Sequence, residues 1–335
     1  MTISKAKQVL KIILQKNHLN VMLHGSPGVG KSQALKQIAD ELGWKFIDIR
    51  LSMLMPSDLL GLPYPDEKHE KTNWLWPSMF PPPNSKDNYI LLFDEIGLAN
   101  VSVQGASYRI CLDRSLGEHY KLPSGVRIVA ATNLITDSSH VQQMSKALAN
   151  RFIHFYIEPN LKSWKEWAYK NNIDGRIIGF LNFKEDMLYR KPNIEDHAYP
   201  TPRSWFFLSR LLEFGIIDEE AIDGTVGKGA ASEFLSYLEV YQKLPDVNKI
   251  LSGKNVAVPK EPSILYALCS SLVTKADKQN ITNIFKYCEK MPVDFHVLTI
   301  RDISRKDDEK GSLLNCYSGF NKWLEKHDAL FNDII

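Results

Sequence analysis

The stretch Gly25-Ser-Pro-Gly-Val-Gly-Lys-Ser32 decides the fold class of this chain. It matches the pattern G-x-x-x-x-G-K-[ST], in which a glycine-rich loop joins a strand to a helix and holds phosphate groups. The strand-like run Asn20–Leu23 precedes it, and a helical pattern that starts at Gln33 follows it. The required strand–loop–helix context is therefore present, and the stretch predicts a phosphate-binding loop.

The residue types in this loop fit contact with a phosphate. Gly28 and Gly30 allow the backbone to turn tightly and to bring N–H groups against phosphate oxygens. The start of the following helix adds a partial positive charge. Lys31 would neutralise charge between the β- and γ-phosphates, and Ser32 would offer its hydroxyl to Mg²⁺. The predicted nucleotide-binding residues are Gly25, Ser26, Pro27, Gly28, Val29, Gly30, Lys31, Ser32 and Gln33.

Around the loop, short β-rich runs alternate with helical patterns such as Ser32–Leu42 and Val101–Leu112, which favours an α/β fold with a parallel sheet flanked by helices. The predicted strands are Asn20–Leu23, Phe46–Leu51, Tyr89–Phe93, Arg127–Ala131 and His154–Ile157. After about residue 158 the pattern becomes mainly helical, and Leu251–Pro262 has the composition of a linker. We therefore expect an α/β nucleotide-binding core over 1–158, a helical domain over 159–250 and a helical segment over 251–335.

Two of these strands end in polar residues. The run from Tyr89 ends in Asp94 and Glu95, and ligands bind at the carboxyl edge of parallel sheets. Asp94 would belong to the Mg²⁺ shell, and Glu95 would act as general base on a water molecule. The run from Arg127 ends in Asn133, whose amide either starts a turn or holds a water or the γ-phosphate; the spacing leaves both interpretations open.

Composition excludes several classes of protein. Hydrophobic residues make up 44% of the 335 residues, so neither extensive disorder nor a small disulfide-stapled fold is expected. Lys+Arg number 41 and Asp+Glu 39, which gives a net charge of +2 and does not indicate nucleic-acid binding. No apolar run approaches the about 18 residues of a membrane span, and the N-terminus lacks a signal-peptide pattern. The four scattered cysteines indicate reduced thiols in the cytoplasm, and the nine histidines show no metal-ligand spacing.

Five motifs in series make the chain similar to a known family. GSPGVGKS, LLFDEIGLA, IVAATN, ALANRF and TPRSW, in that order, resemble the motifs of AAA+ ATPases. Three further segments are similar to the MoxR branch, which often lies beside a von Willebrand factor A partner: DLLGLPYPDE at 58–67, WLWPSMFPPP at 74–83 and DRSLGEHYKLPSG at 113–125. The resemblance is dense from about residue 20 to 215 and thins beyond.

The resemblance implies a P-loop NTPase fold of the AAA+ type, with a helical lid after the core, that binds ATP with Mg²⁺ in a ring, expected to be a hexamer. Asn133 matches sensor 1, Arg151 matches the arginine finger that reaches a neighbouring subunit, and Arg203 matches sensor 2 on the lid. With Glu95, these three are the predicted catalytic residues. Arg114 is a rival for the finger, ranked lower because the Asn-Arg-Phe placement of Arg151 fits better.

Two segments are candidates for contact with a partner. Trp74 and Trp76 precede a proline-rich loop, and they either form an exposed contact surface or pack on the core. Residues 118–121 form the tip of a predicted hairpin, which either faces a partner or is solvated. Three functions follow as hypotheses: an ATP-driven remodeller of a protein partner, a nucleic-acid-directed motor or loader subunit, and a small-molecule P-loop kinase.

Overall fold

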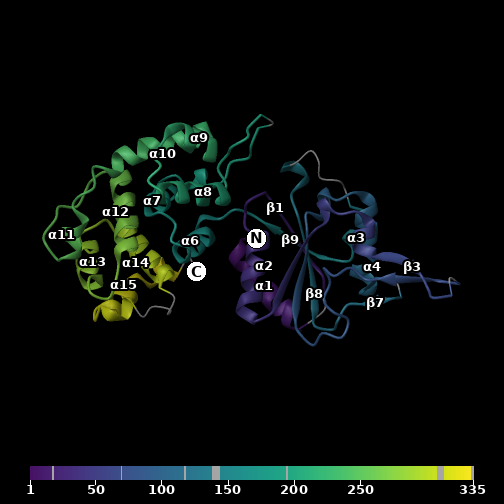
Figure 1. Cartoon of the computed structure of the whole chain (residues 1–335). Coiled ribbons are helices and arrows are strands. Elements are labelled where there is room, and N and C mark those ends of the chain that lie inside the picture. Colours follow the sequence, from purple (N-terminus) through teal and green to yellow (C-terminus); the bar gives the residue numbers. More distant parts are fainter. Residues whose placement is uncertain are drawn as a thin grey trace. The chain divides into compact units, whose positions relative to one another are not determined.

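The computed structural model describes residues 1–16, 19–68, 70–116, 118–137, 144–193, 195–307 and 313–332. The chain divides into two compact units, Met1–Pro159 and Asn160–Ile335 (Figure 1). Within the second unit, buried side chains from both sides of residue 250 belong to one hydrophobic cluster. The separation of 159–250 from 251–335 as distinct domains stays a prediction.

The first unit is built on a five-stranded parallel sheet with the order β2-β5-β8-β1-β9 (Figure 1). Its strands are β1 (Val21–Gly25), β2 (Lys45–Arg50), β5 (Tyr89–Asp94), β8 (Val126–Thr132) and β9 (Ile153–Ile157). All five predicted strands are confirmed, with ends that differ by no more than two residues. The α/β prediction is therefore correct, and β1 lies between β8 and β9.

Helices cover both faces of this sheet. They are α1 (Ile3–Lys16), α2 (Lys31–Leu42), α3 (Pro56–Leu60), α4 (Val101–Asp113) and α5 (Lys146–Ala149). Along β5, Leu91 and Phe93 belong to the cluster that includes α4, whereas Ile90 and Leu92 belong to the cluster that includes α1 and α2. Successive side chains of a strand point to opposite faces, so an uninterrupted apolar run is what this central strand requires.

Two antiparallel hairpins are inserted into the first unit. One pairs β3 (Leu62–Pro65) with β4 (Thr72–Leu75), and the other pairs β6 (Ser115–Leu116) with β7 (Tyr120–Lys121). Trp76 packs against the core cluster and stacks on Tyr120, whose hydroxyl donates to the carbonyl of Pro81 at 2.6 Å. Trp74 is 40% exposed and stacks on His119. Trp76 therefore packs on the core, whereas Trp74 is exposed and its contact with a partner stays a prediction.

The helices of the second unit are α6 (Leu161–Lys170), α7 (Gly175–Phe183), α8 (Pro202–Glu213), α9 (Glu219–Val226), α10 (Lys228–Tyr241), α11 (Val247–Leu251), α12 (Pro262–Lys275), α13 (Ile281–Cys288), α14 (Val293–Lys306) and α15 (Phe320–Asn332). Helices α6 and α7 are separated by a short break. Asn172 has a left-handed backbone there, and the Asp174 carboxylate accepts from the N–H of Arg176 at the start of α7. In the described part of the chain, no helix is long and apolar enough to cross a membrane.

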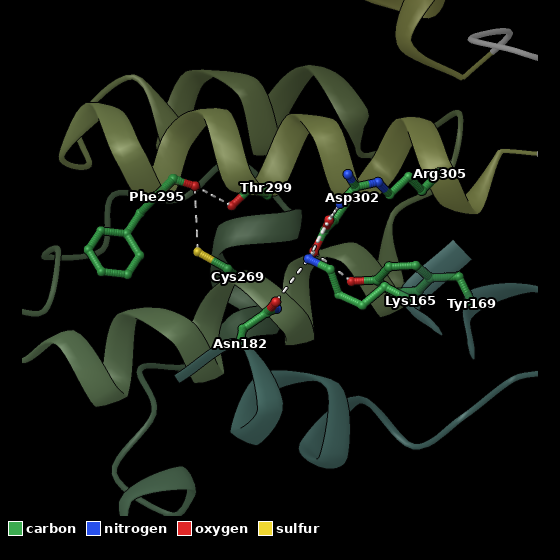
Figure 2. Close-up of polar contacts among 8 residues, drawn as sticks. All are labelled: Lys165, Tyr169, Asn182, Cys269, Phe295, Thr299, Asp302 and Arg305. Carbon is green, nitrogen blue, oxygen red and sulfur yellow. Dashed lines mark hydrogen bonds and ion pairs between the residues drawn. The ribbon is translucent and has the colours of Figure 1, made fainter. Parts of the chain in front are cut away.

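A buried polar network joins α6, α7 and α14 (Figure 2). The Lys165 ammonium donates to both carboxylate oxygens of Asp302 at 2.8 Å and to the amide oxygen of Asn182 at 2.9 Å. Tyr169 and Arg305 also donate to Asp302, each at 2.9 Å. The network therefore fixes α14, which comes late in the sequence, to the first two helices of the unit.

Candidate active site

The loop between β1 and α2 has the backbone that its glycines predict. Gly28 has a φ of 76° and Gly30 a φ of 93°, both in the left-handed region that side chains disfavour. A Cβ added at Gly25 would lie 2.8 Å from the carbonyl oxygen of Ile157 in β9. The loop therefore depends on glycine for two reasons: backbone conformation within it, and close packing on the neighbouring strand before it.

Lys31 lies at the start of α2 with only 8% of its surface exposed. Its ammonium donates to the carbonyl of Gly25 at 2.6 Å, to the carbonyl of Ser26 at 3.1 Å and to the amide oxygen of Asn133 at 3.2 Å. These three acceptors are neutral. Asn133 reaches the lysine because it follows β8, which pairs with β1. The structure therefore brings the predicted sensor and the loop lysine together.

Ser32 and Asp94 lie side by side. The Ser32 hydroxyl donates to a carboxylate oxygen of Asp94 at 2.7 Å, and the other carboxylate oxygen accepts from the N–H of Glu95 at 2.9 Å. Hydroxyl and carboxylate oxygens are hard ligands of the kind that Mg²⁺ prefers. The donor set therefore fits a magnesium ion that enters with a nucleotide.

Glu95 is held by a residue that the sequence did not single out. Its backbone is left-handed, with a φ of 57°, and its carboxylate accepts a short hydrogen bond from the Ser52 hydroxyl. Ser52 follows β2, which pairs with β5 so that Arg50 lies opposite Asp94. No motif marks Ser52, since its role depends on which strand lies next to β5. This contact orients the predicted general base.

A further acid lies near this pair. Burial raises the pKa of Asp48 on β2, and the charge of Asp94 raises it further, while Arg50 acts in the opposite direction. Negative charge therefore accumulates at the carboxyl ends of β2 and β5. A cation that binds there would relieve the repulsion between these carboxylates.

Arg151 lies away from these residues, at the opposite edge of the sheet. It precedes β9, whose first residue Ile153 pairs with Val21 at the beginning of β1, whereas the phosphate loop follows the end of β1. The four residue steps of β1 separate the two edges by about 13 Å at ~3.3 Å per residue. The exposed guanidinium donates to the Tyr108 hydroxyl at 3.2 Å and lies 5.7 Å from the centre of that ring. Tyr108 was also not singled out from the sequence.

The two remaining arginines differ in their surroundings. Arg203 is exposed in the first turn of α8, in the second unit, where Thr201 accepts from the N–H of Ser204 to cap the helix. Its role as sensor 2 stays a prediction. Arg114 is half-buried and donates to the carbonyls of Pro123 and Val126 at 3.2 and 2.8 Å, so it holds the chain that follows the second hairpin.

Other chemistry finds little support in the described residues. No group of three or more His, Cys, Asp or Glu side chains within the described ranges could hold a metal ion. All four cysteines are free thiols, and three of them are buried. His18, His69 and His140 lie outside the described residues.

The chain is similar to one protein family and to several known proteins. Residues 21–159 match the family model "ATPase family associated with various cellular activities (AAA)". Midasin of Giardia intestinalis is 29% identical over 158 residues, which is 45% of this chain but only 3% of that protein. A mutant of Thermotoga maritima RuvB is 18% identical with a TM-score of 0.39, and the match covers 82% of each chain. NtrX of Brucella abortus, solved with ADP, is 12% identical with a TM-score of 0.41, over 96% of this chain and 67% of that one. The family match therefore lies on the segment 21–159, which carries the phosphate loop, Asp94 and Glu95, and the chain spans only a small part of the curated relative's length.

Proposed function

We propose that this chain is a MoxR-like AAA+ ATPase that hydrolyses ATP at the subunit interfaces of a ring and thereby remodels or activates a protein partner. One observation carries the proposal. Lys31 and Glu95 lie at the carboxyl edge of the sheet, whereas Arg151 lies at the amino edge. One copy thus has a phosphate site on one edge and an exposed guanidinium on the other, so the site is completed when a second copy docks.

A contact of this kind is head-to-tail, because the two surfaces that meet are different. Repeated head-to-tail contacts close into a ring when the rotation between copies allows it. Six subunits are the number that the resemblance to MoxR proteins suggests. The four free thiols, three of them buried, fit a reducing compartment, and we place the ring in the cytoplasm.

Within one site, the loop from Gly25 to Gln33 would bind the triphosphate, with Lys31 against the β- and γ-phosphates. Ser32 and Asp94 would hold Mg²⁺, which neutralises charge on the same oxygens when it is bound. Glu95 would take a proton from the attacking water molecule as general base. Ser52 keeps the carboxylate of Glu95 in a fixed orientation before that step.

Three further side chains would act on the γ-phosphate. Asn133, already 3.2 Å from the Lys31 ammonium, would orient the attacking water or the γ-phosphate. Arg151 of the adjacent copy would stabilise the charge that develops on the phosphoryl oxygens, an effect worth roughly 10³–10⁵ in rate for such arginines. Arg203 would contact the phosphates from the helical lid.

The surface of the first unit favours a protein as partner. Several large apolar side chains are exposed on and beside the β3–β4 hairpin: Met53, Met55, Leu62, Trp74 and Leu75. Large apolar side chains exposed near one another in the sequence favour contacts between proteins, whereas nucleic acid requires positive charge. The net charge of only +2 does not supply it. A von Willebrand factor A domain protein is the partner class that the MoxR resemblance suggests.

The alternative is a nucleic-acid-directed motor or loader subunit. It predicts a DNA affinity that falls steeply as salt is raised. A small-molecule kinase, in contrast, would work without an arginine from a second copy, and its rate per subunit would not depend on protein concentration.

The test combines assembly with trapping. We expect the ATPase rate per subunit to rise with protein concentration, since the site needs two copies. The variant Glu95→Gln should bind ATP and hydrolyse it ~10²–10⁴-fold more slowly, because the general base is lost. The trapped ring should retain its protein partner during purification. A rate per subunit that is constant at all concentrations, or wild-type turnover by Glu95→Gln, would overturn the proposal.

A further inference from the structure

Hydrogen bonds connect strand β1 to the turn that carries Arg151, and there is one set of them at each end of the strand. At the beginning of the strand, the side-chain amide of Asn20 donates to the carbonyl of Arg151 at 3.3 Å and to that of Cys111 at 2.9 Å. The Asn20 carbonyl accepts from the N–H of Ile153 at 2.9 Å. The same strand runs directly into the phosphate loop at its other end, so any rearrangement of β1 reaches both places.

The second connection runs through two histidines. His24, the residue before Gly25, lies 2.8 Å from His154 on β9, measured from its Nε2 atom to the Nδ1 atom of His154. The Nε2 atom of His154 lies 2.9 Å from the carbonyl oxygen of Ala149, two residues before Arg151. A hydrogen-bonded chain therefore extends from the edge of the phosphate loop to the turn of Arg151.

The acceptor at the end of this chain fixes its direction. A carbonyl oxygen only accepts, so Nε2 of His154 carries the proton that it donates to Ala149. In neutral His154 the Nδ1 atom is then an acceptor, and His24 must donate to it through its own Nε2–H. Each histidine thus has one defined tautomer, and a second proton on His154 would place two donors against each other.

The surroundings of His24 keep this arrangement in place at neutral pH. Burial lowers the pKa of His24 to about 4, and the nearby His154 and Lys31 act in the same direction. Its ring also stacks on Tyr156, with 4.7 Å between the ring centres. His24 is therefore neutral under ordinary conditions, and its ring contacts His154 and Tyr156 of β9.

We propose that His154 is a positioning residue that connects His24, at the phosphate loop of one subunit, to the turn that presents Arg151 to the next subunit. The inference rests on the proposed function, because it assumes that Arg151 acts on a neighbouring site. Movement of the loop displaces the end of β1, His154 transmits this displacement to the Ala149 carbonyl, and the guanidinium of Arg151 changes its position. Tyr108 steadies that guanidinium through its hydroxyl and ring.

The variants His154→Phe and His24→Phe keep an aromatic ring and remove the hydrogen bonds. We expect kcat to fall about tenfold while the KM for ATP stays within twofold, since the binding side of each site is intact. His154→Gln, which can still accept and donate, should recover most of the rate. His197→Phe, at an exposed histidine of the second unit, is the matched control and should behave as the wild type.

Rings assembled from two variants distinguish a defect in the arginine finger from a defect in the phosphate loop. When Arg151→Ala is mixed equally with Glu95→Gln, roughly one interface in four combines an intact base with an intact arginine, and activity should return in that proportion. His154→Phe and His24→Phe, each mixed with Glu95→Gln, should recover to the same level. If Arg151→Ala mixtures stay inactive, the shared site of the proposed function is wrong. If they recover but the histidine variants do not, the shared site stands and the positioning role of His154 is wrong.

Discussion

Each of the two units contains a buried lysine, and the described hydrogen-bond acceptors of the two ammonium groups differ. In the first unit, the ammonium of Lys31 donates to two backbone carbonyls and one side-chain amide, all neutral. In the second unit, the ammonium of Lys165 lies 2.8 Å from both oxygens of the Asp302 carboxylate (Figure 2). Lys31 is 8% exposed and Lys165 is 3% exposed, so burial alone does not distinguish them.

The difference lies in the acceptors. Burial alone would raise the pKa of Asp302, but the adjacent Lys165 and Arg305 hold it below its usual range, so the carboxylate is ionised and matches the lysine charge. The described hydrogen bonds of Lys31 go to neutral oxygens, and the charged oxygens of a bound phosphate would be stronger acceptors than these. The described contacts of Lys165 thus form a structural ion pair, whereas those of Lys31 join the phosphate loop to Asn133.

The largest expected effect comes from Lys31→Met. Without the ammonium, charge between the β- and γ-phosphates is not neutralised, and we expect kcat/KM for ATP to fall on the order of 10³-fold or more. The thermal midpoint should change by only a few degrees, since Met fills a volume similar to that of Lys and the three described hydrogen bonds go to neutral oxygens. ATPase assays and thermal unfolding check both parts. Wild-type turnover would remove the basis of the comparison.

The same substitution at Lys165 should lower the stability of the fold and leave the KM for ATP almost unchanged. Lys165→Met leaves Asp302 ionised and buried without its main partner, which typically costs about 3–5 kcal/mol of unfolding free energy. Urea unfolding measures the loss, and the KM for ATP of the folded variant should stay within twofold. Lys11→Met is a suitable control because its pair with Glu41 is exposed, and it should cost at most about 1 kcal/mol.

A double variant tests whether the cost at Lys165 comes from the unpaired charge of Asp302. Replacing Lys165 with Met and Asp302 with Leu removes both charges at once, so no ion is left unpaired in the interior. We expect the double variant to recover about 1–3 kcal/mol relative to Lys165→Met, since apolar side chains of similar volume often replace a buried pair at little cost. The recovery should be incomplete because Tyr169 and Arg305 lose their acceptor. A double variant less stable than the single one would contradict this account.

The smallest effect concerns pH. Burial lowers the pKa of His296 in α14 to about 4, with His327 and then Lys326 acting in the same direction. Between pH 6.5 and 4 the unfolded chain binds a proton that the folded chain does not, so stability is full above pH 6.5 and falls as the pH drops to 4. Over the range from pH 7 to 5 we expect the loss to be roughly 1–2 kcal/mol, since one pKa unit corresponds to about 1.4 kcal/mol and this range covers only part of the shift. His296→Phe should reduce the slope in urea unfolding measured from pH 7 to 5, and an unchanged slope would show that other groups carry it.

The sequence predicted the parts of the fold that depend on local pattern. Apolar runs such as 89–93 predicted the strands to within two residues, and the glycines predicted the tight loop between β1 and α2. The β3–β4 hairpin was not predicted, since Pro63 and Pro65 lie in a strand and proline normally argues against one. The helical region was predicted only as a type, because amphipathic patterns do not show which helices pack together.

The sequence alone could not predict which side chains contact the site residues. Ser52 meets Glu95 because β2 lies next to β5, and Tyr108 meets Arg151 because α4 and the start of β9 come together in the fold. Both contacts join residues more than forty positions apart. Strand order has no local signature, so such pairs become visible only once the sheet has been assembled.

The position of β1 between β8 and β9 has a consequence for how the chain folds during its synthesis. Val21 pairs with Val129 and with Ile153, so the strand has no partner until more than a hundred further residues have been synthesised. At typical translation speeds of 5–20 residues per second, that interval lasts roughly 5–20 s. During this time the apolar Val-Met-Leu run of the nascent chain has no strand to pair with. A chaperone that binds nascent chains would protect this run from aggregation.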